Sequence, residues 1–396
     1  MVDFRLTDEQ IALRDLARRF VTEEVRPRAA ALDAEADPAA CFSWGIVERA
    51  SALGLRTLTL EAAYGGAGAD SLTTALLVEE LAVGDLGVSV IFAQTWKILQ
   101  TLQRACTPEQ RERYLPRFRD DPRCLLAIGI TEPEFSSDYI IPSEDPRAGP
   151  SLVAEQRGDA WVLNGAKHFI SNGNRAGLYL IFARTDRTKG VREGMTAFLV
   201  PREASGFTVG RVHDKMGERL VNNAELLFTD CRIPAADLVG RPGEGFPLLA
   251  RFFPASNAYA AASVIGVARA AYERSLQWAR VRVQGGRPLI EHQTVATMLA
   301  EMRMAVDASR AYAWRAAWAA DHPGQWDATL GALPKVQAAE AAWRVTRLAL
   351  EIHGGHGYMR ESGVEKLVRD AAAFLHSDGA NASLKLKAAN AIRQGA

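Results

Sequence analysis

CLLAIGI at residues 124–130 opens a stretch in which short apolar runs alternate with Gly, Asn, Pro and Asp residues. The later runs are AWVLNG (160–165), LYLIFART (178–185), MTAFLV (195–200) and AELLFTD (224–230). Apolar runs of this length that end at turn-forming residues are typical of β-strands. The sequence therefore predicts a β domain over residues 125–239.

Helical patterns lie on both sides of this β domain. Thr7 and Gln10 have the spacing of a capping box, in which each side chain accepts a hydrogen bond from a backbone N–H group of the other residue. Apolar positions with helical period predict four later helices, over 246–281, 289–320 and 328–353 and after Asp378. We therefore expect an α+β protein with an N-terminal helical domain (1–124), a middle β domain (125–239) and a C-terminal helical bundle (240–396).

Composition and charge exclude several classes of protein. The 47 Lys and Arg residues balance 47 Asp and Glu residues, so no basic excess favours nucleic acid. No apolar run is long enough to span a membrane, and the first residues lack the pattern of an export signal. The four cysteines are far apart in the sequence and form no C-x-x-C pair. We expect a folded protein of the cytoplasm, without membrane or nucleic-acid partners.

The sequence carries no standard nucleotide-binding or metal-binding motif. Neither G-x-G-x-x-G nor a P-loop occurs. His353 and His356 flank a Gly pair, Gly354 and Gly355, and no carboxylate or Cys motif completes a ligand set. We therefore predict no metal site, and we expect the Gly pair to let the backbone approach a ligand or a neighbouring helix.

Six motifs occur together in an order that resembles the acyl-CoA dehydrogenase family of flavoproteins. They are AYGGAG (63–68), TEP (131–133), ISNG (170–173), KMGERLVNNAELLFTDCRIP (215–234), EHQ (291–293), and HGGHGY (353–358) followed by VEKLVRDA (364–371). The resemblance covers nearly the whole chain. It implies FAD as cofactor, an acyl-CoA substrate, electron-transfer flavoprotein as electron acceptor and a homotetramer.

The resemblance also assigns residues to the cofactor and the substrate. It places Ile130 and Thr131 at the pyrimidine edge of the flavin, Ser171 near flavin N5, and Phe169 where the family usually has Trp. Arg282 matches an arginine that binds the pyrophosphate across a subunit interface. The other cofactor positions that it implies are Ile170, Gln284, Gln293, Glu351, Gly354, Gly355 and Ala380, and the substrate positions are Ser137, Asn257 and Gly379.

Asp378 stands at the position of the family's catalytic Glu, counted from Arg369. The carboxylate is retained on a side chain that is one methylene shorter. Some relatives carry the base at the position of Asn257, which cannot act as a carboxylate base. The alternative interpretation is that Asp378 is the N-cap of the last helix, since Asp is a preferred N-cap residue.

Three hypotheses for function follow. The leading one is α,β-dehydrogenation of an acyl-CoA whose acyl group is cyclic or branched, because the base is short and a Pro- and Gly-rich insert follows Asp138. The second is a flavin-dependent monooxygenase or oxidase on the same fold, and His376, at a usually apolar position, is compatible with it. The third is a flavoprotein without redox activity.

Overall fold

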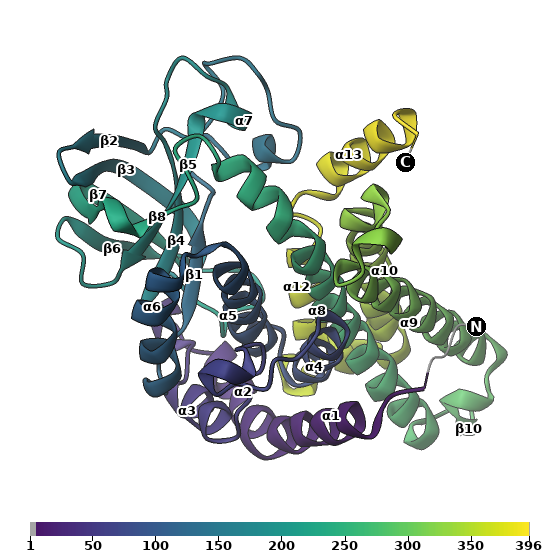
Figure 1. Ribbon diagram of the computed structural model, residues 1–396. Helices are drawn as coiled ribbons and strands as arrows, with labels where there is room; N and C mark the ends of the chain where they lie inside the picture. Colours follow the sequence, from purple (N-terminus) through teal and green to yellow (C-terminus); the bar gives the residue numbers. More distant parts are fainter. Residues whose placement is uncertain (1–4, 396) are drawn as a thin grey trace.

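The computed structural model describes residues 5–395 and begins with a group of helices (Figure 1). The capping box of Thr7 and Gln10 is present at the first of them, as predicted. A π-helical turn, Val21–Val25, connects the first two helices. The helices of this part are α1 (Asp8–Phe20), α2 (Arg26–Asp33), α3 (Trp44–Ala52), α4 (Ser71–Gly84), α5 (Leu86–Ala105) and α6 (Pro108–Asp120).

The middle part of the chain forms one mixed sheet with the order β6-β7-β3-β2-β4-β5-β8, and β1 pairs with β4 in parallel. A short helix, α7 (Val191–Gly194), precedes β5. The strands are β1 (Leu126–Gly129), β2 (Val153–Arg157), β3 (Ala160–Ser171), β4 (Leu178–Arg184), β5 (Met195–Pro201), β6 (Phe207–Val212), β7 (Asn223–Pro234) and β8 (Leu238–Val239). The five predicted strands are confirmed. The strands β2 and β6 were not predicted, because charged and polar residues interrupt their apolar pattern.

The last part of the chain is helical, with a two-stranded hairpin between its first two helices. Its elements are α8 (Gly245–Val281), β9 (Val283–Gln284), β10 (Arg287–Pro288), α9 (Gln293–Ala320), α10 (Leu333–His353), α11 (Gly355–Tyr358), α12 (Val364–Ala373) and α13 (Asn381–Arg393). The predicted third helix begins five residues later than expected, because Pro334 occupies its first turn and lacks a backbone N–H donor. α12 was not predicted.

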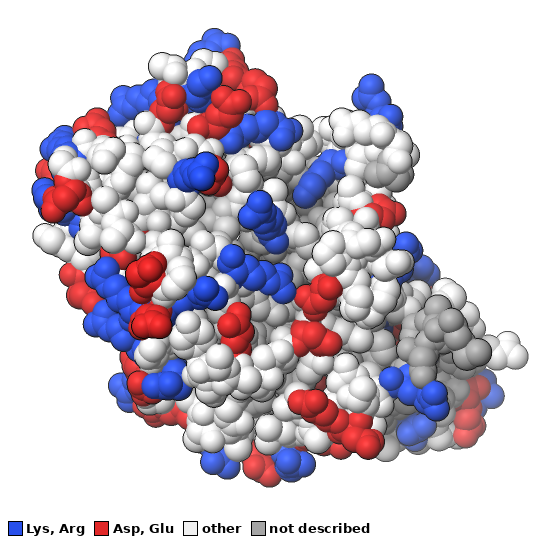
Figure 2. Space-filling model, in the orientation of Figure 1, with Lys and Arg blue, Asp and Glu red and all other residues white. Residues whose placement is uncertain are grey.

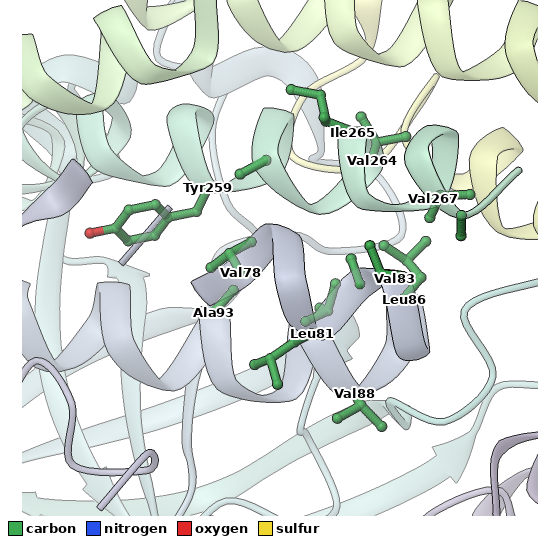
Figure 3. Close-up of a cluster of buried hydrophobic side chains, with 14 of the residues drawn as sticks. Val78, Leu81, Val83, Leu86, Val88, Ala93, Tyr259, Val264, Ile265 and Val267 are labelled. Atoms are coloured by element: carbon green, nitrogen blue, oxygen red, sulfur yellow. The ribbon is translucent and has the colours of Figure 1, made fainter. Parts of the chain in front are cut away.

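α8 joins the parts of the molecule. It starts beside the sheet and runs between α4 and α5 on one side and α9 and α10 on the other (Figure 1). Side chains of α4, α5 and α8 interdigitate in the core, among them Leu81, Leu86 and Val264 (Figure 3). Gly266 permits this contact, since a Cβ atom there would lie 2.5 Å from the carbonyl oxygen of Glu79.

Charged side chains of both signs are interspersed over the face of the molecule shown in Figure 2. No extended basic surface dominates that face, which agrees with the zero net charge. None of the helices described between residues 5 and 395 combines the length and the apolar character needed to cross a membrane.

Candidate active site

One cavity collects most of the predicted site residues. It has a volume of about 920 Å³ and lies between α5, the ends of β1 and β3, the start of α8 and the segment that joins α12 to α13. The predicted residues on its wall are Ile130, Thr131, Ser137, Phe169, Ile170, Ser171, Asp378, Gly379 and Ala380. The structure thus brings together residues from the middle and last parts of the chain.

A buried lysine fixes the loop that follows β1. Lys167 of β3 has no exposed surface, and its Nζ donates to the carbonyl oxygen of Ile130 (3.0 Å) and to Oε1 of Glu132 (2.7 Å). Burial lowers the pKa of Lys167, and the charge of Glu132 opposes that shift. The Glu132 carboxylate also accepts a hydrogen bond from the backbone N–H of Leu152. These bonds hold Ile130 and Thr131 in place at the cavity wall.

Phe169 presents an aromatic face at the same wall. Its φ angle is +59°, an uncommon value for a residue other than glycine, and it lies where the pairing of β3 with β7 is irregular. The ring is 55% exposed and stacks on His168, with the ring centroids 4.0 Å apart. Nδ2 of Asn223 donates to the carbonyl oxygen of Phe169 (2.9 Å) and to Oγ of Ser171 (3.3 Å). An aromatic face and a hydroxyl group are therefore held side by side.

A cluster of His168, His213 and Glu225 lies next to this wall, and its potential ligand atoms are within 4.8 Å of one another. It is the one group of three potential metal ligands among residues 5–395. Burial, together with the charges of His168 and Arg211, lowers the pKa of His213. Nη2 of Arg211 lies 3.4 Å from Nδ1 of His213, and a guanidinium at this distance repels a metal cation.

Asp378 forms an ion pair at the opposite end of the site. Its Oδ1 lies 3.0 Å from Nζ of Lys97, a residue of α5 that is 4% exposed. Nζ of Lys97 also donates to Oγ of Ser256 (3.1 Å). The φ angle of Asp378 is +49°, so its backbone has a strained left-handed conformation.

A second buried lysine fixes the segment that carries Asp378. Nζ of Lys335 donates to the carbonyl oxygens of Phe374 (2.6 Å) and Gly379 (2.7 Å) and to Oδ1 of Asn381 (2.9 Å). Burial lowers the pKa of Lys335 to about 8, although the charge of Asp378 raises it. The turn also requires Gly379, whose φ angle is +94°.

The N-cap interpretation of Asp378 is wrong. α13 begins at Asn381, and its cap residue, Ala380, provides no side-chain hydrogen bond. Asp378 lies three residues before the helix and bonds to Lys97 of α5. Its carboxylate is therefore free of a capping role and faces the cavity.

Tyr139 lines the main cavity together with the segment that carries Asp378. Its ring stacks on Phe253 of α8, with centroids 5.4 Å apart and the planes nearly parallel. Burial raises the pKa of the Tyr139 phenol, and the negative charge of Asp378 raises it further. The phenol is therefore uncharged beside the Asp378 carboxylate.

Five predicted cofactor residues line a second cavity of about 460 Å³: Arg282, Gln284, Glu351, Gly354 and Gly355. Within residues 5–395 the Arg282 guanidinium forms no ion pair, and it lies over the ring of Trp278 at 5.8 Å. His353 lies beside the same ring: its Nδ1 is 2.8 Å from the carbonyl oxygen of Ala349, and its ring stacks on Trp278.

The structure leaves two predicted residues outside both cavities. Asn257 is 1% exposed, and its Nδ2 donates to the carbonyl oxygen of Gly331. Gln293 is the exposed first residue of α9. Neither residue contributes to the wall of the main cavity.

The sequence analysis did not predict Lys97 and Tyr139, which line the main cavity, or Lys335, which holds the segment that carries Asp378. One signal for Lys97 was present in the sequence, because it is the only charged residue in the apolar run between residues 86 and 103. Lys335 and Tyr139 carry no such signal, since their partners are more than 35 residues away in the sequence.

The residues on the walls fit FAD. The main cavity is large enough for a planar ring system together with part of a substrate. Within residues 5–395 the Thr131 hydroxyl has no hydrogen-bond partner, and the exposed ring of Phe169 offers a surface for stacking. The unpaired guanidinium of Arg282 suits a phosphate group.

Comparison with known proteins gives a consistent result. The N-terminal, middle and C-terminal domain models of acyl-CoA dehydrogenases match residues 7–120, 127–231 and 243–392. Cyclohex-1-ene-1-carbonyl-CoA dehydrogenase of Geobacter metallireducens is 34% identical over 388 residues, which cover 98% of each chain.

Two solved structures superpose on nearly the whole chain. Butyryl-CoA dehydrogenase of Megasphaera elsdenii has a TM-score of 0.92 at 31% identity, with 99% of this chain and 100% of that chain covered. A second structure, whose description names the electron transferring flavoprotein of Acidaminococcus fermentans, has a TM-score of 0.91 at 29% identity, with 99% of each chain covered. The chain therefore belongs to the acyl-CoA dehydrogenase family, as an FAD-dependent oxidoreductase that acts on the CH–CH bond of acyl-CoA thioesters.

Proposed function

We propose that this enzyme introduces an α,β double bond into an acyl-CoA thioester, with Asp378 as the catalytic base. One observation carries the proposal: the Asp378 carboxylate lines the same cavity as Thr131, Phe169 and Ser171. The reaction requires a base for the α-proton and a hydride acceptor for the β-hydrogen within one site.

Asp378 would take the α-proton onto a carboxylate oxygen. FAD, when bound, supplies the acceptor for the hydride that leaves the β-carbon. The electrons of the Cα–H bond form the double bond, and the thioester becomes an enoyl thioester. Lys97 holds the carboxylate in place through the 3.0 Å ion pair, and Lys335 holds the backbone on either side of it.

A cyclic or branched acyl group remains our proposal for the substrate. The relative from Geobacter metallireducens is named for a cyclic acyl-CoA. In addition, Tyr139, the first residue after Asp138 and so the first of the insert, lines the cavity. The insert therefore contributes to the walls that a substrate meets.

Electron-transfer flavoprotein is the proposed electron acceptor, in keeping with the similar solved structure whose description names that protein.

A homotetramer is the proposed assembly. Arg282 and the Gly354–Gly355 pair lie in a cavity separate from the one at Asp378, so a second subunit would have to bring the two halves of the cofactor site together.

Asp378→Asn tests the mechanism. The amide preserves the shape of the side chain but accepts no proton, so we expect flavin reduction by the best acyl-CoA to fall by about 10²–10⁴ while FAD and acyl-CoA still bind. Anaerobic stopped-flow absorbance measures the reduction rate, and spectral titration measures binding. Reduction of the Asn variant at the parental rate would rule out Asp378 as the base.

Asp378→Glu is the matched companion. The extra C–C bond adds about 1.5 Å, and Nζ of Lys97 already lies 3.0 Å from the carboxylate. We therefore expect slower reduction by the native acyl-CoA, because the longer side chain displaces the acyl group.

Rapid reoxidation of the reduced flavin by air would favour the oxidase or monooxygenase hypothesis instead.

A further inference from the structure

One face of α5 forms a polar wall within the main cavity. Val90, Gln94 and Lys97 follow the spacing i, i+4 and i+7, which places them on one side of the helix, and all three line the cavity. Gln94 is 8% exposed and Lys97 is 4% exposed. An amide and an ammonium group are therefore buried one turn apart, in the cavity that Asp378 also lines.

Both side chains keep unused hydrogen-bonding capacity. Among residues 5–395, Oε1 of Gln94 has no hydrogen-bond partner. The Lys97 ammonium has three N–H donors, and two of them are used, by Oδ1 of Asp378 and Oγ of Ser256. One acceptor and one donor on neighbouring turns of α5 thus remain for a ligand.

The position of these groups relates them to the acyl chain, and this step rests on the proposed function. If Asp378 removes the α-proton, the α-carbon must come within hydrogen-bonding reach of its carboxylate. Nζ of Lys97 lies 3.0 Å from that carboxylate, and Gln94 lines the same cavity, so an acyl chain that continues from the reacting carbons toward α5 meets both side chains. A pure hydrocarbon chain would displace water from both groups and replace none of their hydrogen bonds, which is unfavourable.

We propose that Gln94 and Lys97 form a subsite for an oxygen substituent of the acyl group, one or two carbons beyond the β-carbon. The oxygen accepts a hydrogen bond from the third N–H of Lys97. A hydroxyl group satisfies both residues, because it also donates to Oε1 of Gln94, whereas a carboxylate satisfies Lys97 alone.

Three thioesters of similar length test the subsite: butanoyl-CoA, 4-hydroxybutanoyl-CoA and succinyl-CoA. Their dissociation constants are measured on the FAD-loaded enzyme by the change in flavin absorbance, and their reduction rates by anaerobic stopped flow. We expect at least one oxygen-bearing ester to bind about 10- to 100-fold more tightly than butanoyl-CoA, as is usual for a hydrogen bond to a charged group.

Two variants separate the two residues. Lys97→Met keeps the length of the side chain without its charge, and it should abolish the preference for the oxygen-bearing esters. Gln94→Leu leaves the Lys97–Asp378 pair intact, and it should reduce the preference for the hydroxyl ester while it leaves any preference for succinyl-CoA unchanged. Lys385→Met, at an exposed ion pair with Glu340, is the control and should change none of these values.

Equal or tighter binding of butanoyl-CoA by the parent enzyme would overturn the subsite, as would a preference that survives Lys97→Met. A preference for succinyl-CoA that Lys97→Met removes supports the subsite with a carboxylate as the bound oxygen. Failure of the proposed function has a different signature, since the esters would then bind with these preferences and none would reduce the flavin.

Discussion

Lys335→Met is the most informative perturbation of the segment that carries Asp378. Met has a similar length, but it cannot donate to the carbonyl oxygens of Phe374 and Gly379 or to Oδ1 of Asn381. Each buried acceptor left without a donor costs about 1 kcal/mol or more. An uncharged Lys335 amine has two N–H donors, so relative to a parent in that form the variant should lose about 2 kcal/mol of folding free energy.

The charge of Lys335 makes this loss depend on pH. Burial lowers the pKa of Lys335 from 10.5 to about 8, which corresponds to about 3 kcal/mol of unfavourable free energy when the group is protonated in the folded state. Between pH 8 and pH 10.5 the unfolded chain holds a proton that the folded chain has released, so parental stability rises with pH across this window. Below pH 8 the burial penalty of about 3 kcal/mol on the charged amine and the lost hydrogen bonds, worth about 2 kcal/mol, largely offset each other.

We therefore expect Lys335→Met and the parent to have similar stability at pH 7 and the variant to be clearly less stable at pH 10. Urea unfolding of the FAD-loaded enzymes, followed by circular dichroism at both pH values, measures the difference between the midpoints. Other groups titrate equally in both proteins and drop out of the comparison. A difference that stays constant, or that shrinks as the pH rises, would refute the reasoning.

Two further substitutions test other parts of the structure. Arg282→Ala should weaken FAD retention by about 10- to 100-fold with little effect on folding, because Arg282 has no ion pair to lose within residues 5–395. Gel filtration with flavin quantification measures the retention, and full retention would contradict the role of Arg282 in binding FAD. Gly266→Val should destabilise the α4–α8 contact by about 1–3 kcal/mol or more, because Cβ would lie 2.5 Å from the carbonyl oxygen of Glu79. Thermal unfolding measures the loss of stability, and an unchanged melting temperature would contradict the close packing of α4 and α8.

The sequence predicted those elements whose pattern is local. The capping box at Thr7 and the apolar strands β3, β4 and β5 depend on neighbouring residues, and each is present. The cap role of Asp378 failed because that local pattern competes with a partner 281 residues away in the sequence, Lys97. A side chain that can form either contact takes the one that the tertiary structure offers, and sequence spacing does not contain that information.

The motifs predicted the cavity wall at the ends of β1 and β3 better than the wall formed by helices. Ile130, Thr131, Phe169 and Ser171 belong to two short segments, and the structure brings all four to one wall. The helices of the other wall are distant from one another in the sequence. α5 contributes its buried face there, and Lys97 is the one charged residue between residues 86 and 103.

Asp378 and the buried Lys97 depend on each other. The side chain of Lys97 is 4% exposed, and its ammonium would be costly to bury without the Asp378 carboxylate 3.0 Å away. The same lysine occupies space that a longer base would need, since one more methylene moves a carboxylate by about 1.5 Å. The short side chain of Asp378 therefore leaves room for Lys97, and the charges of the two residues compensate each other. If Asp378 is the base, the chain keeps a carboxylate at this position while Lys97 makes the adjoining part of the cavity polar.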